Sequence, residues 1–179
     1  MTDGPEFARP FRLGMIGGEP RRVEIAADEA ERAALATRFG LVSIGCLEAE
    51  ALLRREGPQV WAEGRLHAEA VQSCVATGDP IAARVDEPFA LRFDPATPGA
   101  DDEEVELDEA DLDRLGYEGG AIDLGEAVAQ GFSLALDPFP RVADADQRLR
   151  AAGVASEDEA EAQRVATSPF AALKDLGRK

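Results

Sequence analysis

The feature that most constrains this chain is the alternation of apolar and polar residues between positions 41 and 93. A period of two is typical of a β-strand with one buried face. In the first of three such stretches, Glu48 and Glu50 oppose an apolar side made of Leu47, Ala49, Ala51 and Leu53. The Glu, Ala and Leu content of this stretch would also suit a helix. The alternation favours a strand.

Two further stretches repeat the pattern. Gly57-Pro58 marks a turn, after which the alternation resumes through Val60, Ala62, Gly64, Leu66, Ala68 and Ala70. The third stretch runs from Ile81 to Val85 and resumes at Phe89, so we expect a bulge or bend at Pro88. Short connections between adjacent strands predict an antiparallel meander, either open or closed into a barrel-like form.

A helix is predicted before the strands, over residues 28–40. Asp28 is a good N-cap, Glu31 completes a capping box, and Gly40 suits the C-terminal cap. Its apolar face is expected to consist of Ala30, Ala33, Ala34 and Phe39. Upstream, the segment RPFRLGMIGGEPRRVEIAA predicts two short strands and a turn.

A second main helix is predicted after residue 122. Asp123 is its N-cap, Glu126 would close a second capping box, and Asp137-Pro138 should end it. Its apolar face comprises Leu124, Val128, Phe132 and Leu136. The fold class is therefore α+β, with a single domain over residues 1–140 that packs two main helices on an antiparallel sheet.

The chain carries a net charge of −17, and more than half of the excess lies between residues 94 and 118. This inserted segment has 11 acids against Arg114 alone, and only Val105–Leu107 could form a brief strand, so we expect a mobile acidic loop. Such charge disfavours binding to phosphate backbones and favours basic protein partners, although acidity also serves solubility. The candidate partner-binding acids are Asp101, Asp102, Glu103 and Glu104.

The last part of the chain is expected to be a tether that ends in a short helix. Residues 141–167 form a polar, flexible linker with at most a weak helix over 156–166. In residues 168–179, Ser168 and Pro169 suit a helix start, and an apolar stripe follows. The stripe consists of Phe170, Leu173 and Leu176, beside the basic residues Lys174, Arg178 and Lys179. This helix could dock on its own domain or on a partner.

Three motifs carry a resemblance to a known family. They are CVATGDPIAARVDEPFALRF, GGAIDLGEAVAQGFSLALDPFPR and the terminal SPFAALKDLGRK. In this order and spacing the chain resembles the large ribosomal RNA subunit accumulation protein family, also called DUF177 or YceD-like, from Val60 to its end. The motif residues are Cys74, Ile122, Asp123, Leu124, Leu136, Pro138, Pro140, Pro169 and Phe170.

The resemblance implies a non-enzymatic factor for the accumulation or processing of large-subunit (23S) rRNA. Its partners would be ribosomal proteins or assembly factors of the large subunit, with rRNA contacted directly or through them. Two alternatives stay open: a metal-dependent RNA-processing enzyme that uses acidic residues, and an acidic protein-binding module unrelated to ribosomes. A surface that repels RNA weighs against the enzyme.

Metal, cofactor and catalytic chemistry are not predicted. Many relatives have Cys-x-x-Cys where this chain has Cys74 and Thr77, and Cys46 and His67 add no zinc-ligand spacing, so we expect no metal site. His67 falls on the charged side of its strand, and Cys74 should be a small buried residue. We expect no cofactor, catalytic residue or small-molecule substrate. No membrane span or signal peptide is evident, which predicts the cytoplasm.

Overall fold

Three long antiparallel strands form the centre of the fold, as the alternation predicts. The computed structural model describes residues 4–96, 113–155, 159–161, 164 and 167. Its central strands are β3 (Ser43–Glu56), β4 (Gln59–Ser73) and β5 (Pro80–Pro95). The apolar residues of β3 and β4 named above are buried, apart from the half-buried Gly64, and the Glu residues between them are exposed or half-buried. The period of two therefore separates a core face from a polar face.

Two shorter strands complete a five-stranded sheet in the order β2-β3-β4-β5-β6. Strand β2 (Arg21–Ala26) pairs antiparallel to β3, whereas β6 (Asp113–Tyr117) pairs parallel to β5. The meander prediction is correct for β2 to β5 and wrong for β6, which lies inside the predicted loop 94–118. Since β2 and β6 are at opposite ends of this order, the sheet is not a closed barrel.

The irregular point in the sheet lies in β3, and the bulge predicted at Pro88 does not form. β5 keeps its register with β4 through Pro88, which pairs with Arg65. Proline has no backbone N–H to donate to a neighbouring strand. Pro88 can be accommodated because β6 pairs with β5 only over Leu91–Pro95, so no described strand needs a hydrogen bond from position 88 on that side. The register shifts instead between Ile44 and Cys46.

Gly64 allows an unusually close approach of β3 and β4. A Cβ atom at this position would lie 2.0 Å from the carbonyl oxygen of Glu50 and 2.9 Å from Cα of Ala51. Both are backbone atoms, so no side-chain rotation could relieve the contact. The alternation therefore continues through Gly64 with the one residue type that fits.

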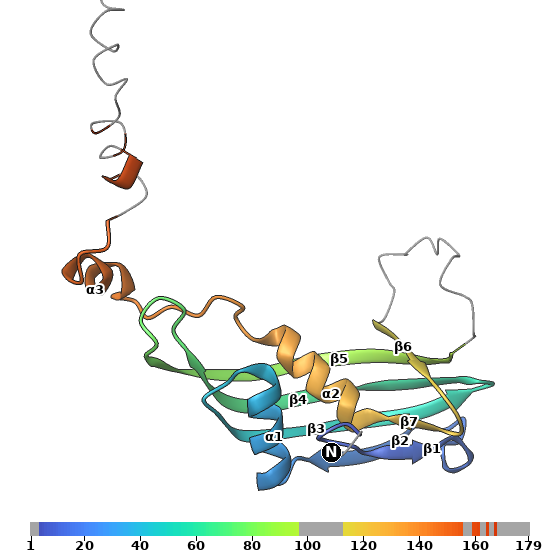
Figure 1. Cartoon of the computed structure of the whole chain (residues 1–179). Helices are drawn as coiled ribbons and strands as arrows, with labels where there is room; N and C mark the ends of the chain where they lie inside the picture. The colour runs from blue at the N-terminus through green and yellow to red at the C-terminus, as the bar shows by residue number, and fades with distance from the viewer. Residues whose placement is uncertain (1–3, 97–112, 156–158, 162–163, 165–166, 168–179) are drawn as a thin grey trace, which may run out of the picture. The chain divides into compact units, whose positions relative to one another are not determined.

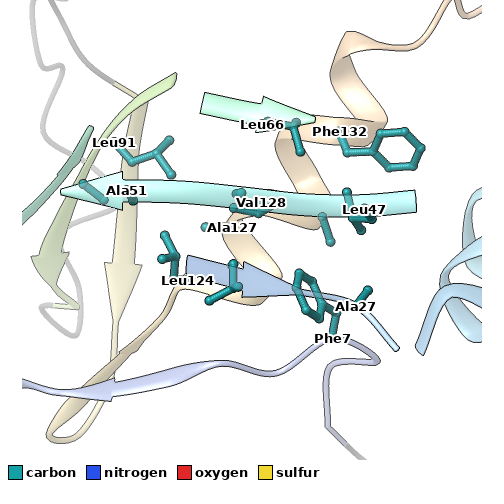
Figure 2. Close-up of a cluster of buried hydrophobic side chains, with 14 of the residues drawn as sticks. Phe7, Ala27, Leu47, Ala51, Leu66, Leu91, Leu124, Ala127, Val128 and Phe132 are labelled. Atoms are coloured by element: carbon teal, nitrogen blue, oxygen red, sulfur yellow. The ribbon is translucent and has the colours of Figure 1, made fainter. Parts of the chain in front are cut away.

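A second, small sheet lies with helix α2. It pairs β1 (Pro10–Arg12) antiparallel to β7 (Ala121–Asp123); the 3-10 helix η1 (Leu13–Met15) follows β1, and α2 (Leu124–Ala135) follows β7. α2 contacts β1, β4 and β5 (Figure 1). Figure 2 shows Val128 and Phe132 of α2 in one apolar cluster with Leu47 and Leu66 of the sheet. The predicted face of α2 is confirmed, and the helix ends before Asp137-Pro138.

Helix α1 (Glu29–Phe39) has the predicted ends but a different buried face. Asp28 accepts the backbone N–H of Glu31 in a complete capping box, and Gly40 adopts the left-handed conformation. The buried residues are Leu35 and Ala36, with Phe39 partly buried, whereas the predicted Ala30, Ala33 and Ala34 are exposed. Alanine has a small side chain, so its position in the sequence is a weak indicator of the buried face of a helix. The packing of α1 against β3 decides which side is buried.

By contacts the chain divides into two units, Met1–Ser73 with Pro80–Pro138, and Cys74–Asp79 with Phe139–Lys179. The second unit contains α3 (Ala145–Ala151), which the sequence analysis missed within its predicted linker. Ala145 is buried, and Asp144 binds the Arg148 side chain. Residues 159–161 and 164 are helical, inside the stretch where a weak helix is expected. The domain bounds 1–140 and 141–167 stay a prediction.

Candidate functional site

Most polar side chains of β2 to β5 form a second face of the sheet, called here the outer face. These side chains alternate with the core residues and are exposed or half-buried, whereas Gln72 of β4 is buried. The outer face includes Arg22, Glu24, Glu48, Glu50, Glu63, Arg65, His67, Glu69, Arg84 and Asp86. An antiparallel sheet can present one face to water, and this face of the sheet carries many charged side chains.

A depression of about 520 Å³ lies on the outer face. Its polar lining comprises Glu24, Glu48, Glu50, Arg65, His67 and Asp86. Four carboxylates thus face one guanidinium and one imidazole, so the depression is negative. It favours cations over anions such as phosphate.

Arginines link several of these carboxylates. Arg22 contacts both Glu24, at 3.2 Å, and Glu50, at 2.5 Å, which are direct cross-strand partners and would otherwise repel each other. Arg65 hydrogen-bonds Asp86 and thereby lowers the pKa of that carboxyl group. These pairs are exposed, so each contributes little to stability.

Cys46, Glu48 and His67 form a cluster at the same face. One candidate ligand atom from each side chain lies within 4.8 Å of the others. Cys46 and Glu48 are two residues apart on β3, and Glu48 pairs directly with His67 on β4. Burial, followed by the nearby charges of Glu48 and Glu69, raises the pKa of the Cys46 thiol. The sequence analysis did not find this cluster, because Cys46 and His67 are brought together by the pairing of β3 with β4. The distance between two residues along the sequence does not reveal that pairing.

Trp61 lies between two arginines on the outer side of β4. The guanidinium of Arg54 is 4.8 Å from the ring centroid and that of Arg92 is 5.8 Å away. Both distances fit cation–π contacts. The Trp61 Nε1 atom is buried and has no hydrogen-bond acceptor among the described residues. The ring is engaged by the protein's own cations, which makes this stack a structural element of the sheet.

The Ile122-Asp123-Leu124 motif holds the N-terminal segment on helix α2. Ile122 and Leu124 are buried, and the Asp123 side chain accepts the backbone N–H groups of Arg9, at 2.8 Å, and Glu126, at 3.1 Å. The second capping box is only half formed, because the Glu126 carboxylate binds the guanidinium of Arg38 at 2.8 and 2.9 Å. This bidentate pair has two parallel hydrogen bonds, which add geometric specificity as well as energy.

Gly125 completes this arrangement. A Cβ atom here would lie 2.1 Å from the carbonyl oxygen of Phe7 and 3.0 Å from the backbone nitrogen of Arg9. Phe7 is fully buried, so the close approach of its backbone to α2 is needed for a core contact. The central motif therefore has a structural role in the first unit.

The later motif residues differ in exposure. Leu136 packs partly against the core, Pro138 is exposed, and Pro140 is buried in the second unit, where its carbonyl accepts the backbone N–H of Val75. Leu134, between the buried part of α2 and this segment, is 84% exposed. Packing in the core explains why the buried positions are apolar. It gives no reason for an apolar side chain at position 134.

Cys74 is buried in the second unit, as its predicted role requires. Hydrogen bonding by the side chain of Thr77, with further help from the backbone N–H of Val142, lowers the pKa of Cys74 to about 7. Thr77 thus stands where a Cys-x-x-Cys pattern would have its second cysteine, and its hydroxyl donates to Asp79 Oδ2 at 2.6 Å. Arg148 binds Asp79 at 2.7 Å close to this turn.

All of the predicted partner-binding residues lie outside the described part of the chain. They are the acids Asp101, Asp102, Glu103 and Glu104, and the C-terminal Phe170, Leu173, Lys174, Leu176 and Arg178, together with the motif residue Pro169. Their role stays a prediction. Among the helices that the structure describes, none combines the length and apolarity of a membrane span.

A protein-family model described as large ribosomal RNA subunit accumulation protein YceD matches residues 62–177. The match begins in β4 and includes the Cys74 turn, the Ile122-Asp123-Leu124 motif and α2. No curated protein matches the chain, and neither does a solved structure.

Proposed function

Because the chain belongs to the large ribosomal RNA subunit accumulation protein family, we propose that it is a non-enzymatic accessory factor in large-subunit biogenesis. It supports the accumulation or processing of large-subunit rRNA by contacting proteins of the maturing particle. The observation that carries this proposal is the family match over residues 62–177, more than half of the chain.

The chemistry of the outer face supports a binding role over catalysis. An enzyme that acts on RNA needs a positive surface to hold the phosphate backbone. The depression on the outer face is instead lined by four carboxylates against one guanidinium. With a net charge of −17, the chain attracts basic proteins rather than phosphate backbones.

The proposed partners are basic ribosomal proteins or assembly factors of the large subunit. Residues 101–104 would supply acidic contacts, and the stripe of Phe170, Leu173 and Leu176 an apolar one. Two weak contacts on one chain can give useful affinity together. rRNA is contacted either through these proteins or by Lys174 and Arg178.

Leu134 is a third proposed contact. It lies within the matched region on α2, and its 84% exposure is the largest among the large hydrophobic side chains of the described residues. A leucine that adds nothing to its own core can add to binding when a partner covers it.

Co-sedimentation with large-subunit precursors tests the proposal. Leu134→Glu should weaken association with the particles while leaving the melting temperature nearly unchanged, because the side chain is exposed. Met15→Glu is the matched control, since Met15 is also apolar and exposed, at 67%, but lies outside the matched region. Deletion of residues 168–179 should also reduce association.

The same purified protein should be incubated with precursor rRNA and Mg²⁺. The proposal expects no cleavage above that of a mock preparation. Wild-type protein that stays at the top of the gradient, free of particles, would contradict the binding role, and RNA turnover that follows the protein through purification would contradict the non-enzymatic one.

A further inference from the structure

The cluster of Cys46, Glu48 and His67 combines three different donor atoms. It offers a sulfur, a carboxylate oxygen and an imidazole nitrogen, all within 4.8 Å of one another. Mg²⁺ and Ca²⁺ prefer sites made of oxygen alone, whereas Zn²⁺ accepts S, N and O together. From this donor set we propose that Cys46, Glu48 and His67 bind one Zn²⁺ ion.

The geometry needs little adjustment to hold the ion. Zn²⁺ bonds of about 2.0–2.3 Å in a tetrahedron place neighbouring donor atoms about 3.3–3.6 Å apart. The ligand atoms already lie within 4.8 Å of one another, and none of the three side chains is fully buried.

The fold brings these residues together through strand register. Glu48 pairs with His67, and Cys46 pairs with Glu69, which lies two residues after His67 on the same face of β4. The register shift at Gly45 lets Ile44 turn into the core, where it is buried, while Cys46 remains beside Glu48. Bulges often re-aim a side chain beside a functional site. β3 and β4 lie side by side in the sheet (Figure 1), so the proposed ion would bind to two neighbouring strands.

The charges around the cluster are consistent with a divalent ion. When Zn²⁺ binds, the Cys46 thiol releases its proton to solvent, and one thiolate and one carboxylate then balance the two positive charges. The nearby carboxylates Asp86 and Glu69 are bound to Arg65 and Arg84, so they surround the site without being needed as ligands. Three protein ligands leave the fourth tetrahedral position open to water or to a donor atom from a partner.

The site is independent of the ribosomal role, and purified protein is sufficient to test it. Tag-free full-length chain, kept reduced with a phosphine, is titrated with Co²⁺ as a spectroscopic substitute for Zn²⁺. One equivalent should produce a thiolate-to-cobalt charge-transfer band in the near ultraviolet, together with the intense visible bands of tetrahedral Co²⁺. Zn²⁺ should remove both sets of bands, and excess Mg²⁺ should remove neither.

Variants assign the ligands. Cys46→Ser should abolish the charge-transfer band, and His67→Asn and Glu48→Gln should each weaken Co²⁺ binding by at least about tenfold, since even residues behind the ligands contribute that much. Two controls should bind as wild type: Cys74→Ser, which removes the other thiol, and Glu63→Gln, which removes an outer-face acid outside the cluster.

Zn²⁺ should also raise the melting temperature of the wild type and of Cys74→Ser but not that of His67→Asn. Circular dichroism establishes that each variant is folded before titration. The assignment is wrong if the wild type gives no charge-transfer band at micromolar protein and excess Co²⁺. It is equally wrong if Cys74→Ser removes the band and Cys46→Ser keeps it.

Discussion

Asp123 connects the N-terminal segment to α2, and its replacement should reveal how much of the fold depends on the family motif. Its Oδ1 atom accepts two backbone N–H groups, one from Arg9 and one from Glu126. Loss of an N-cap costs about 0.5–2 kcal/mol, and an N–H left without an acceptor costs about 1–3 kcal/mol. Asp123→Ala should therefore lower the free energy of unfolding by about 2–4 kcal/mol.

Two variants separate the double role from ordinary capping. Asp28→Ala removes a cap whose side chain accepts only the Glu31 N–H, so it should cost about 1 kcal/mol. Asp123→Asn keeps an acceptor oxygen with two lone pairs and should retain most of the stability.

Urea denaturation, followed by far-UV circular dichroism and by Trp61 fluorescence, measures all three changes. The expected order of destabilisation is Asp123→Ala, then Asp28→Ala, with Asp123→Asn nearest the wild type. If Asp123→Ala costs no more than Asp28→Ala, the bond to Arg9 contributes nothing and the proposed link between segment and helix is refuted.

Three further perturbations test other parts of the fold by the same denaturation assay. Gly125→Ala should lower the free energy of unfolding by about 1–3 kcal/mol, because the new Cβ atom would lie 2.1 Å from a backbone oxygen. Gly131→Ala on the same helix meets nothing within 4 Å and should raise the free energy of unfolding by up to about 1 kcal/mol. Equal effects of the two substitutions would contradict the close approach at Gly125. The Arg38 guanidinium lowers the pKa of Glu126 from its ordinary value of 4.5, so this pair stabilises above that pH and the contribution is lost as the pH falls through the lowered value. Arg38→Gln should thus destabilise at pH 7 and make little difference at about pH 2; a constant difference across the range would exclude this linkage. Phe132→Ala should cost about 3–5 kcal/mol because its side chain is fully buried, and a loss below about 1 kcal/mol would show that the core is packed differently.

Local patterns predicted the parts of the fold that local chemistry determines. The alternation in β3 and β4 was predictable because one face is covered by the core. From Leu47 onward in β3, and throughout β4, the buried residues fall at every second position. The capping box of Asp28 and Glu31 forms as predicted because all its atoms belong to four consecutive residues. The face of α2 was also predictable, since Leu124, Val128 and Phe132 are large apolar residues at helical spacing.

The errors arise where distant segments decide the outcome. β6 could not be recognised as a strand because its few residues follow a long acidic segment and gain their partner only from β5. Glu126 was assigned to a cap from its spacing, but Arg38, which is 88 residues away, binds it instead. The buried face of α1 depends on packing against β3, and an Ala-rich helix does not mark that face.

The candidate sites follow the same division. The sequence alone does not show that Cys46, Glu48 and His67 are neighbours, because their proximity depends on the register of β3 and β4. A register slip of one residue would turn these side chains to the other face of the sheet. A search for metal-ligand types at alternate positions on paired strands could have found them. The exposure of Leu134 likewise becomes visible only once α2 is placed on the sheet.

The account holds that this chain supports large-subunit rRNA through contacts and not through turnover. The most direct measurement is the ratio of large-subunit to small-subunit rRNA in cells depleted of the chain and then supplied with wild-type or Leu134→Glu protein. The account predicts that the ratio falls on depletion, recovers with the wild type, and recovers less with the variant. A ratio that stays constant on depletion would contradict it.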